Sequence, residues 1–136
     1  MEKNVNFNLS SYSPLVLAYM GDAYYETLVR KFIIANGDCK TSELNKIAKN
    51  YVTAVNQSKA VEKILPFLDE NEEIIYKSGR NAKSNHSAKS ADVLDYRRAT
   101  GLETLFGYFY LSDNHDRATE LFNIIAAEEH SNDGSN

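Results

Sequence analysis

The sequence predicts an all-α fold. Apolar residues recur three and four positions apart through most of the chain, and this spacing aligns them along one face of a helix. No segment keeps the strict apolar–polar alternation of a half-buried strand. Helix start and stop signals divide the chain into segments of ordinary helix length. We therefore expect a helical bundle.

The first half of the chain predicts three helices. Ser13 is a good N-cap, proline suits the first helical position, and Asn36-Gly37 is a natural stop, so one helix should span residues 14–36. A second should begin at Thr41 or Ser42. A third should cover roughly residues 57–65, where Pro66 ends or bends it.

The second half predicts three more. A short helix over residues 69–78 opens with acidic residues, which suit the positive end of the helix dipole. After a basic loop, a long helix should run from about Asp92 to Leu111, and a last one over residues 116–130. Residues 13–130 should form one domain. The polar ends, residues 1–12 and 131–136, are expected to be flexible and disordered, respectively.

Composition limits the class of protein. The chain has 136 residues, 43% of them hydrophobic and 25% charged, as is typical of one soluble globular domain. Its longest apolar run, residues 15–20, is too short to span a bilayer, and no secretory signal opens the chain, so we expect no membrane partner. The single cysteine, Cys39, excludes an internal disulfide and fits a reducing cytoplasm. Because the three histidines lack ligand spacing, any metal should be a hard cation held by carboxylates.

One segment is basic although the net charge is −4. Residues 74–91 contain no acid but carry four basic residues and a histidine, and two arginines follow (Lys77, Arg80, Lys83, His86, Lys89, Arg97, Arg98). A basic segment on an acidic protein is typical of a phosphate-binding site. Composition alone fits a solvated loop equally well.

Two carboxylates occupy unexpected positions. In "LAYMGDAYYE", Asp22 follows a mid-helix glycine and shares a mostly apolar helical face, so it should point toward the core. Glu103 sits on a similar apolar, aromatic face of the long later helix. If the two acids meet in a partly buried site, a divalent cation such as Mg²⁺ would compensate their charge. An arginine for each acid, Arg30 or Arg97, is an equally good alternative.

Three motifs, in this order, resemble the ribonuclease III catalytic domain: "LAYMGDAYYE", "KSGRNAKS" and "YRRATGLETLFGYFYL". The chain is most similar to the Mini-III branch, which lacks a separate double-stranded-RNA-binding domain. The resemblance implies a homodimeric, Mg²⁺-dependent endoribonuclease of the cytoplasm that cleaves double-stranded RNA in 23S ribosomal RNA maturation, with a ribosomal protein as a further candidate partner. A related fold that binds structured RNA without cutting it is the alternative.

The resemblance also assigns residues. Asp22 and Glu103 match the family's essential metal-binding acids, while Ala18 and Thr100 stand where larger family members have two more. Glu26 and Thr100 are candidate auxiliary groups. The expected RNA contacts are Lys77, Arg80, Asn81, Lys83, Ser84, Lys89 and Arg97, with Gly79 allowing a sharp turn. The resemblance predicts a basic residue near position 55, but this chain has Val55 there.

Overall fold

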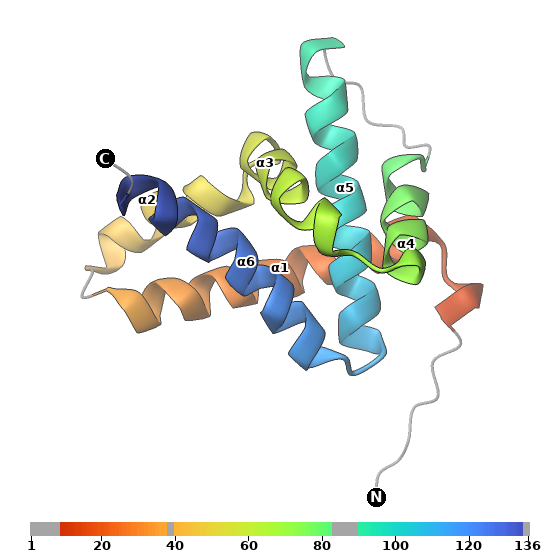
Figure 1. Cartoon of the computed structure of the whole chain (residues 1–136), viewed down its shortest axis with the longest axis horizontal. Coiled ribbons are helices and arrows are strands. Elements are labelled where there is room, and N and C mark those ends of the chain that lie inside the picture. Colours follow the sequence, from red (N-terminus) through yellow and green to blue (C-terminus); the bar gives the residue numbers. More distant parts are fainter. Residues whose placement is uncertain (1–8, 38–39, 83–89, 135–136) are drawn as a thin grey trace, which may run out of the picture.

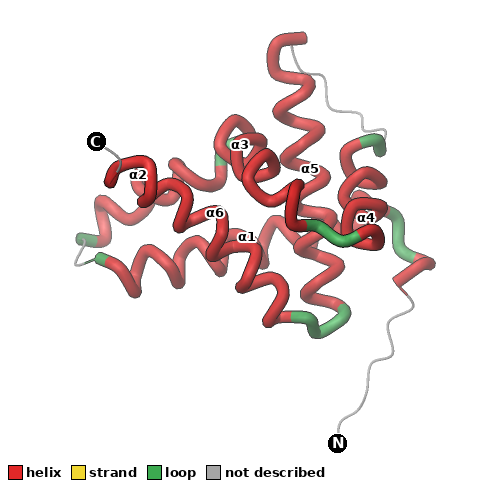
Figure 2. The backbone as a smooth tube through the Cα atoms, viewed as in Figure 1, coloured by secondary structure: helices red, strands yellow, loops and turns green. Residues whose placement is uncertain are grey.

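The computed structural model of the chain describes residues 9–37, 40–82 and 90–134. Within these ranges the structure is helical and contains no strand, which confirms the predicted all-α fold (Figures 1 and 2). No described helix is long and apolar enough to cross a membrane. The elements in chain order are η1 (Leu9–Ser11), α1 (Pro14–Asn36), α2 (Thr41–Val52), α3 (Ala54–Ile64), η2 (Leu65–Phe67), α4 (Glu70–Arg80), α5 (Ser90–Leu111) and α6 (His115–Gly134).

Helix α5 is the centre of the bundle. It crosses α1, and α3, α4 and α6 also pack against it. Helix α2 lies against the C-terminal part of α1 (Figure 1), and α6 packs against α3 and α5. Both acids singled out in the sequence therefore lie on the two helices that pack most extensively against each other, α1 and α5.

Capping residues explain where the helices begin. The Ser13 hydroxyl accepts a hydrogen bond from the Val16 N–H at 3.2 Å, as predicted for the start of α1. Helix α3 begins three residues earlier than predicted, because Thr53 caps it. Asp69 and Glu72 form a capping box at the start of α4, in which each carboxylate accepts a hydrogen bond from the backbone N–H of the other residue.

Helices α4 and α6 end later than predicted. Helix α4 continues through Gly79 to Arg80, and α6 extends four residues beyond His130 to Gly134. Of the ends expected to be loose, residues 9–11 form η1, while residues 1–8 and 135–136 lie outside the described residues, as does Cys39.

An aromatic core holds α1, α5 and α6 together. The Tyr25 ring meets Phe106 at 5.2 Å and Phe122 at 5.7 Å between centroids, both edge to face. Such pairs add about 0.5–1.5 kcal/mol each beyond the burial of their apolar area. The largest fully buried side chains around them are Phe109, Ile64, Leu102, Leu105, Leu121, Val29, Val61 and Thr104.

The Tyr25 hydroxyl is buried without a hydrogen-bond partner among the described residues. Tyr25 is 1% exposed, and burial raises the pKa of its phenol above the ordinary value. An unsatisfied buried hydroxyl costs about 1–3 kcal/mol. We expect Tyr25→Phe to raise the free energy of unfolding by about 1 kcal/mol in urea denaturation.

Tyr24→Phe is the matched control, because the Tyr24 hydroxyl is hydrogen-bonded to Nδ1 of His115 at 2.8 Å. That variant should lose about 1 kcal/mol of stability. Equal destabilisation by the two variants would show that the Tyr25 hydroxyl has a partner.

Candidate metal centre

Two glycines allow α1 and α5 to cross with their backbones touching. A methyl group added at Gly21 would overlap the carbonyl of Glu103 and lie 2.7 Å from the Gly107 nitrogen. One added at Gly107 would overlap the carbonyl of Leu17. A mid-helix glycine costs about 1 kcal/mol relative to alanine, and here it makes the close crossing possible. The crossing brings the residue after Gly21, which is Asp22, next to Glu103.

Asp22 and Glu103 form a carboxylate pair at this crossing. Burial, followed by the negative charge of Asp22 and a hydrogen bond to it, raises the pKa of Glu103 to about 7, while a hydrogen bond from Gln57 opposes the shift. Glu103 is partly buried, whereas Asp22 is exposed at the rim. The expectation that Asp22 points into the core is therefore wrong. Because α1 and α5 cross closely at Gly21 and Gly107, Asp22 lies at the surface beside Glu103 and not in the core.

The described residues do not support the alternative in which Arg30 or Arg97 neutralises each acid. Arg30 binds Glu26, one turn away on α1, with 2.6 Å between Nη2 and Oε2. Arg97 is exposed, and Arg98 binds Glu62 of α3 at 3.0 Å. Across the described ranges, neither Asp22 nor Glu103 forms an ion pair with a basic side chain. Among the described residues, no basic side chain compensates the charge of the pair.

These residues fit a hard divalent cation. Two carboxylates close together, one of them with a raised pKa, are stabilised by a cation that binds oxygen. Mg²⁺ needs only one or two protein carboxylates and takes its other ligands from water and phosphate. The described residues contain no group of three or more acidic, histidine or cysteine side chains placed to bind a metal. Most of the coordination shell would therefore be left to water and a ligand.

The raised pKa of Glu103 predicts a pH-dependent stability in the metal-free protein. In the folded state Glu103 keeps its proton up to about pH 7, whereas the ordinary value is 4.5. The stabilisation is therefore fully present below about pH 4.5 and is lost as the pH rises through 7, up to about 3 kcal/mol. We expect Glu103→Gln, which cannot ionise, to escape this loss.

Thermal unfolding in chelator at about pH 5 and about pH 8 measures the effect. The stability advantage of Glu103→Gln over the wild type should grow with pH. An advantage that is the same at both pH values would contradict the raised pKa.

A third side chain, Gln57 of α3, reaches the pair. Its Nε2 donates a hydrogen bond to Oε2 of Glu103 at 3.5 Å, and the residue is 3% exposed. Gln57 is not among the residues singled out from the sequence. The signal is present there, because Gln57 shares a helical face with the buried apolar Val61 and Ile64, the same anomaly that distinguishes Asp22.

The structure places the first predicted RNA-binding residues on a helix. Lys77 and Arg80 lie in the last turn of α4, where Lys77 pairs with Glu73 at 3.1 Å and Arg80 lies over the Tyr76 ring. Arg80 Nε also donates to Asn81 Oδ1 at 3.0 Å. Arg97 is exposed on α5. Lys83, Ser84, His86 and Lys89 lie outside the described residues.

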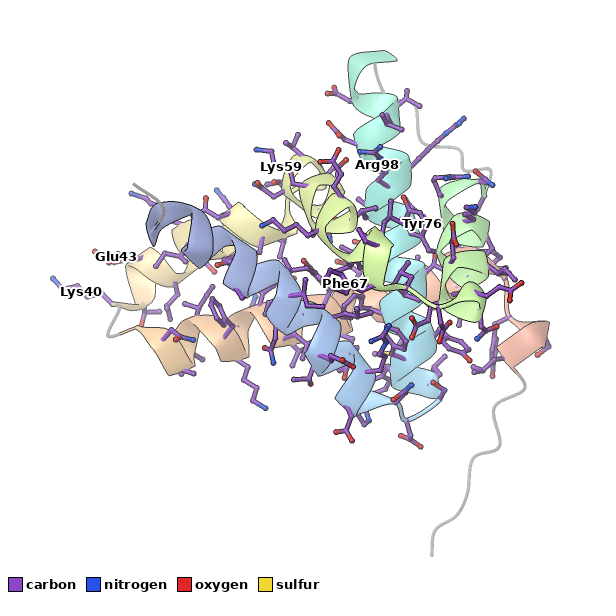
Figure 3. The ribbon with its side chains drawn as sticks, in the orientation of Figure 1. Lys40, Glu43, Lys59, Phe67, Tyr76 and Arg98 are labelled. Carbon is purple, nitrogen blue, oxygen red and sulfur yellow. The ribbon has the colours of Figure 1, made fainter. Side chains whose placement is uncertain are left out.

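The expectation that Gly79 allows a sharp turn is wrong. Gly79 is inside α4 and buried against α5, where an added methyl group would overlap the Thr104 hydroxyl and lie 3.1 Å from the Gly101 Cα. Its neighbour Tyr76 packs between α4 and α5 in the same way (Figure 3). Gly79 therefore serves helix packing.

The two candidate auxiliary groups are otherwise engaged. The Glu26 carboxylate is held by Arg30. The Thr100 hydroxyl donates to the carbonyl of Tyr96, one turn back on α5, at 3.0 Å, and Thr100 is buried. Val55, where a basic residue is expected, is 47% exposed near the start of α3. Lys59 is exposed one turn farther along (Figure 3).

Comparison with known proteins agrees with this architecture. The Ribonuclease III domain model matches residues 15–114. "Mini-ribonuclease 3" of Brevibacillus brevis is 48% identical over 120 residues, 85% of this chain and 90% of the relative. "Mini-ribonuclease 3" of Clostridium tetani is 42% identical over 133 residues, 95% and 88% of the two chains. A crystal structure of a Fusobacterium nucleatum protein aligns with a TM-score of 0.78 and 33% identity, covering 91% of this chain and 99% of that chain.

Proposed function

The chain belongs to the ribonuclease III family, in its Mini-ribonuclease 3 branch, and is an endoribonuclease; we propose that it cleaves double-stranded RNA with a Mg²⁺ ion bound by Asp22 and Glu103. The observation that carries the proposal is the carboxylate pair at the α1–α5 crossing, which has no basic partner among the described residues. A protein that only bound RNA would gain nothing from two uncompensated acids beside a phosphate backbone.

Each acid has a distinct part in this site. Glu103, partly buried, supplies a carboxylate from the central helix α5, while Asp22 supplies one from an exposed position, where a phosphate can approach. When bound, Mg²⁺ supplies positive charge that stabilises the transition state of phosphodiester displacement and favours deprotonation of the attacking water. Hydrolysis should leave 5′-phosphate and 3′-hydroxyl ends. Since the cation requires ionised acids, binding should strengthen as the pH rises through about 7.

The proposal includes a homodimer. A domain of this size meets one side of an RNA duplex, and a two-fold dimer would bring one site to each strand. Of the aromatic side chains of α1 and α5, Tyr24, Tyr25, Phe106 and Phe109 are buried in the core, whereas Tyr19 is 85% exposed. Leu15 and Val16, which lie one turn before Tyr19 on α1, are exposed as well. This stretch of α1 is the face we assign to the dimer.

Family membership supports a proposal for the substrate and the compartment. We propose precursor 23S ribosomal RNA as the substrate, the cytoplasm as the compartment and a ribosomal protein as a further partner. An A-form duplex is recognised mainly through phosphates and 2′-hydroxyls. The cationic end of α4 and the exposed Arg97 are suited to such interactions.

A cleavage assay tests the proposal. Duplex RNA is incubated with the purified protein and Mg²⁺, beside a chelator control and single-stranded RNA of the same sequence. We expect cutting of the duplex alone, dependent on Mg²⁺, with 5′-phosphate ends. Duplex binding without cutting would instead favour the non-catalytic RNA-binding alternative.

The basic segment gives a separate prediction. Arg80→Ala combined with Lys83→Ala should weaken duplex binding about tenfold and lower the salt slope of log K by roughly one for each phosphate-binding side chain removed. Filter binding in Ca²⁺ at several salt concentrations measures both. Lys31→Ala with Lys46→Ala, which removes the same charge from exposed positions of α1 and α2, is the control. An unchanged salt slope in the Arg80/Lys83 variant would remove these residues from the interface.

A further inference from the structure

Gln57 is a buried polar side chain that is hydrogen-bonded to a proposed metal ligand. It is 3% exposed, and its Nε2 lies 3.5 Å from Oε2 of Glu103. An ionised carboxylate only accepts hydrogen bonds, so the NH₂ group of the amide must face it. Burying the Gln57 amide would destabilise the fold if the amide made no hydrogen bond. The hydrogen bond to Glu103 reduces this cost.

The helix that carries Gln57 is fixed to the helix that carries Glu103. Arg98 of α5 donates to the Ser58 hydroxyl at 3.4 Å and pairs with Glu62 at 3.0 Å, both on α3 (Figure 3). Ser58 is the residue next to Gln57 and is also 3% exposed. These interactions tie the register of α3 to α5 beside the amide. The position of Gln57 relative to Glu103 is thus set by the fold.

The neutral amide also keeps the charge of the site suited to one divalent cation. Gln57 adds a donor without adding a third negative charge to Asp22 and Glu103. Because its N–H occupies one lone pair of Oε2, it restricts rotation of the Glu103 carboxylate. Side chains that orient a metal ligand in this way are worth about 10–100-fold in metal affinity or activity.

We propose that Gln57 is a positioning residue of the cleavage site, whose side-chain amide holds the Glu103 carboxylate in the orientation that binds the divalent cation. This inference rests on the proposed function, because it assumes that Asp22 and Glu103 bind the cation. It extends the site to a third helix, α3. Gln57 itself acts through Glu103 and touches neither cation nor RNA.

Calorimetric titration of the full chain with Mn²⁺, without RNA and at about pH 8, tests the proposal. Gln57→Met keeps a side chain of similar length and removes the donor, and we expect Mn²⁺ binding about 10–100-fold weaker than in the wild type. The kcat for duplex cleavage should fall similarly, while KM for the duplex stays within about twofold because Gln57 is buried. Ile64→Val, which removes one methylene from an equally buried position two turns farther along α3, is the matched control and should leave Mn²⁺ affinity and kcat unchanged.

A second variant keeps the test decisive if Gln57→Met does not fold. Gln57→Asn retains the amide but draws it back by one methylene, so it should also lose Mn²⁺ affinity. Wild-type Mn²⁺ affinity in a folded Gln57 variant overturns the inference, even if its melting temperature or kcat falls. If Asp22→Asn loses Mn²⁺ binding and Gln57→Met does not, the inference fails and the proposed function stands. Absence of Mn²⁺ binding by the wild type overturns both.

Discussion

Asp22→Asn is expected to reduce Mg²⁺-dependent cleavage of duplex RNA by about 1,000-fold or more. The substitution preserves shape and removes one of two protein carboxylates at the α1–α5 crossing. Since the described residues contain no group of three acids placed to bind a metal, we expect none of them to replace the lost carboxylate. The decrease corresponds to about 4 kcal/mol of transition-state stabilisation, within the several kcal/mol that a catalytic metal supplies. Single-turnover cleavage with enzyme in excess measures it.

Stability separates a missing ligand from a damaged fold. Asp22 is exposed, and its negative charge opposes ionisation of Glu103, so the asparagine variant should unfold in chelator at the wild-type temperature or slightly above it. Asp113→Asn is the matched control. Asp113 is 89% exposed in the turn before α6, at a φ of 59° that asparagine tolerates, and the variant should cleave normally. Cleavage by Asp22→Asn within tenfold of the wild type would contradict the assignment.

Gly21→Ala should both destabilise the protein and disable the site. The added methyl group would overlap the carbonyl of Glu103, which is backbone and cannot rotate away. The helices must separate, at a cost of about 3 kcal/mol or more, despite the better helix propensity of alanine. Separation moves Asp22 away from Glu103, and a displacement of about 1 Å in an active site can cost 100-fold in rate. Urea denaturation and kcat measure the two effects.

The control is Ala35→Leu, which adds a larger volume at an exposed position near the end of the same helix. It should change neither stability nor kcat appreciably. Wild-type stability in Gly21→Ala would show that the backbones of α1 and α5 do not touch where they cross. Reduced stability with full activity would show that the crossing does not set the distance between the two acids.

Local signals predict most of the fold. Ser13-Pro14 and Asn36-Gly37 mark the ends of α1 correctly because capping and backbone conformation depend on neighbouring residues. The two acids can also be identified from helical faces alone. Each stands among apolar residues on its own helix, and the structure brings them together where those helices cross.

The features that the sequence does not reveal depend on packing between helices. Gly79 is expected in a turn because a glycine followed by polar residues usually marks one, yet it lies in α4 to let Thr104 approach. The exposure of Asp22 follows from where Gly21 and Gly107 meet, which helical periodicity does not specify. Gln57 belongs to a helix whose packing against α5 cannot be deduced from its own sequence.

The most direct measurement is a crystal structure of the protein soaked in Mn²⁺, with the ion located by its anomalous scattering. We predict one strong peak at the α1–α5 crossing, within coordination distance of a carboxylate oxygen of both Asp22 and Glu103, and its disappearance in Glu103→Gln crystals. No peak there, or a peak bound by neither residue, would contradict the proposed metal centre.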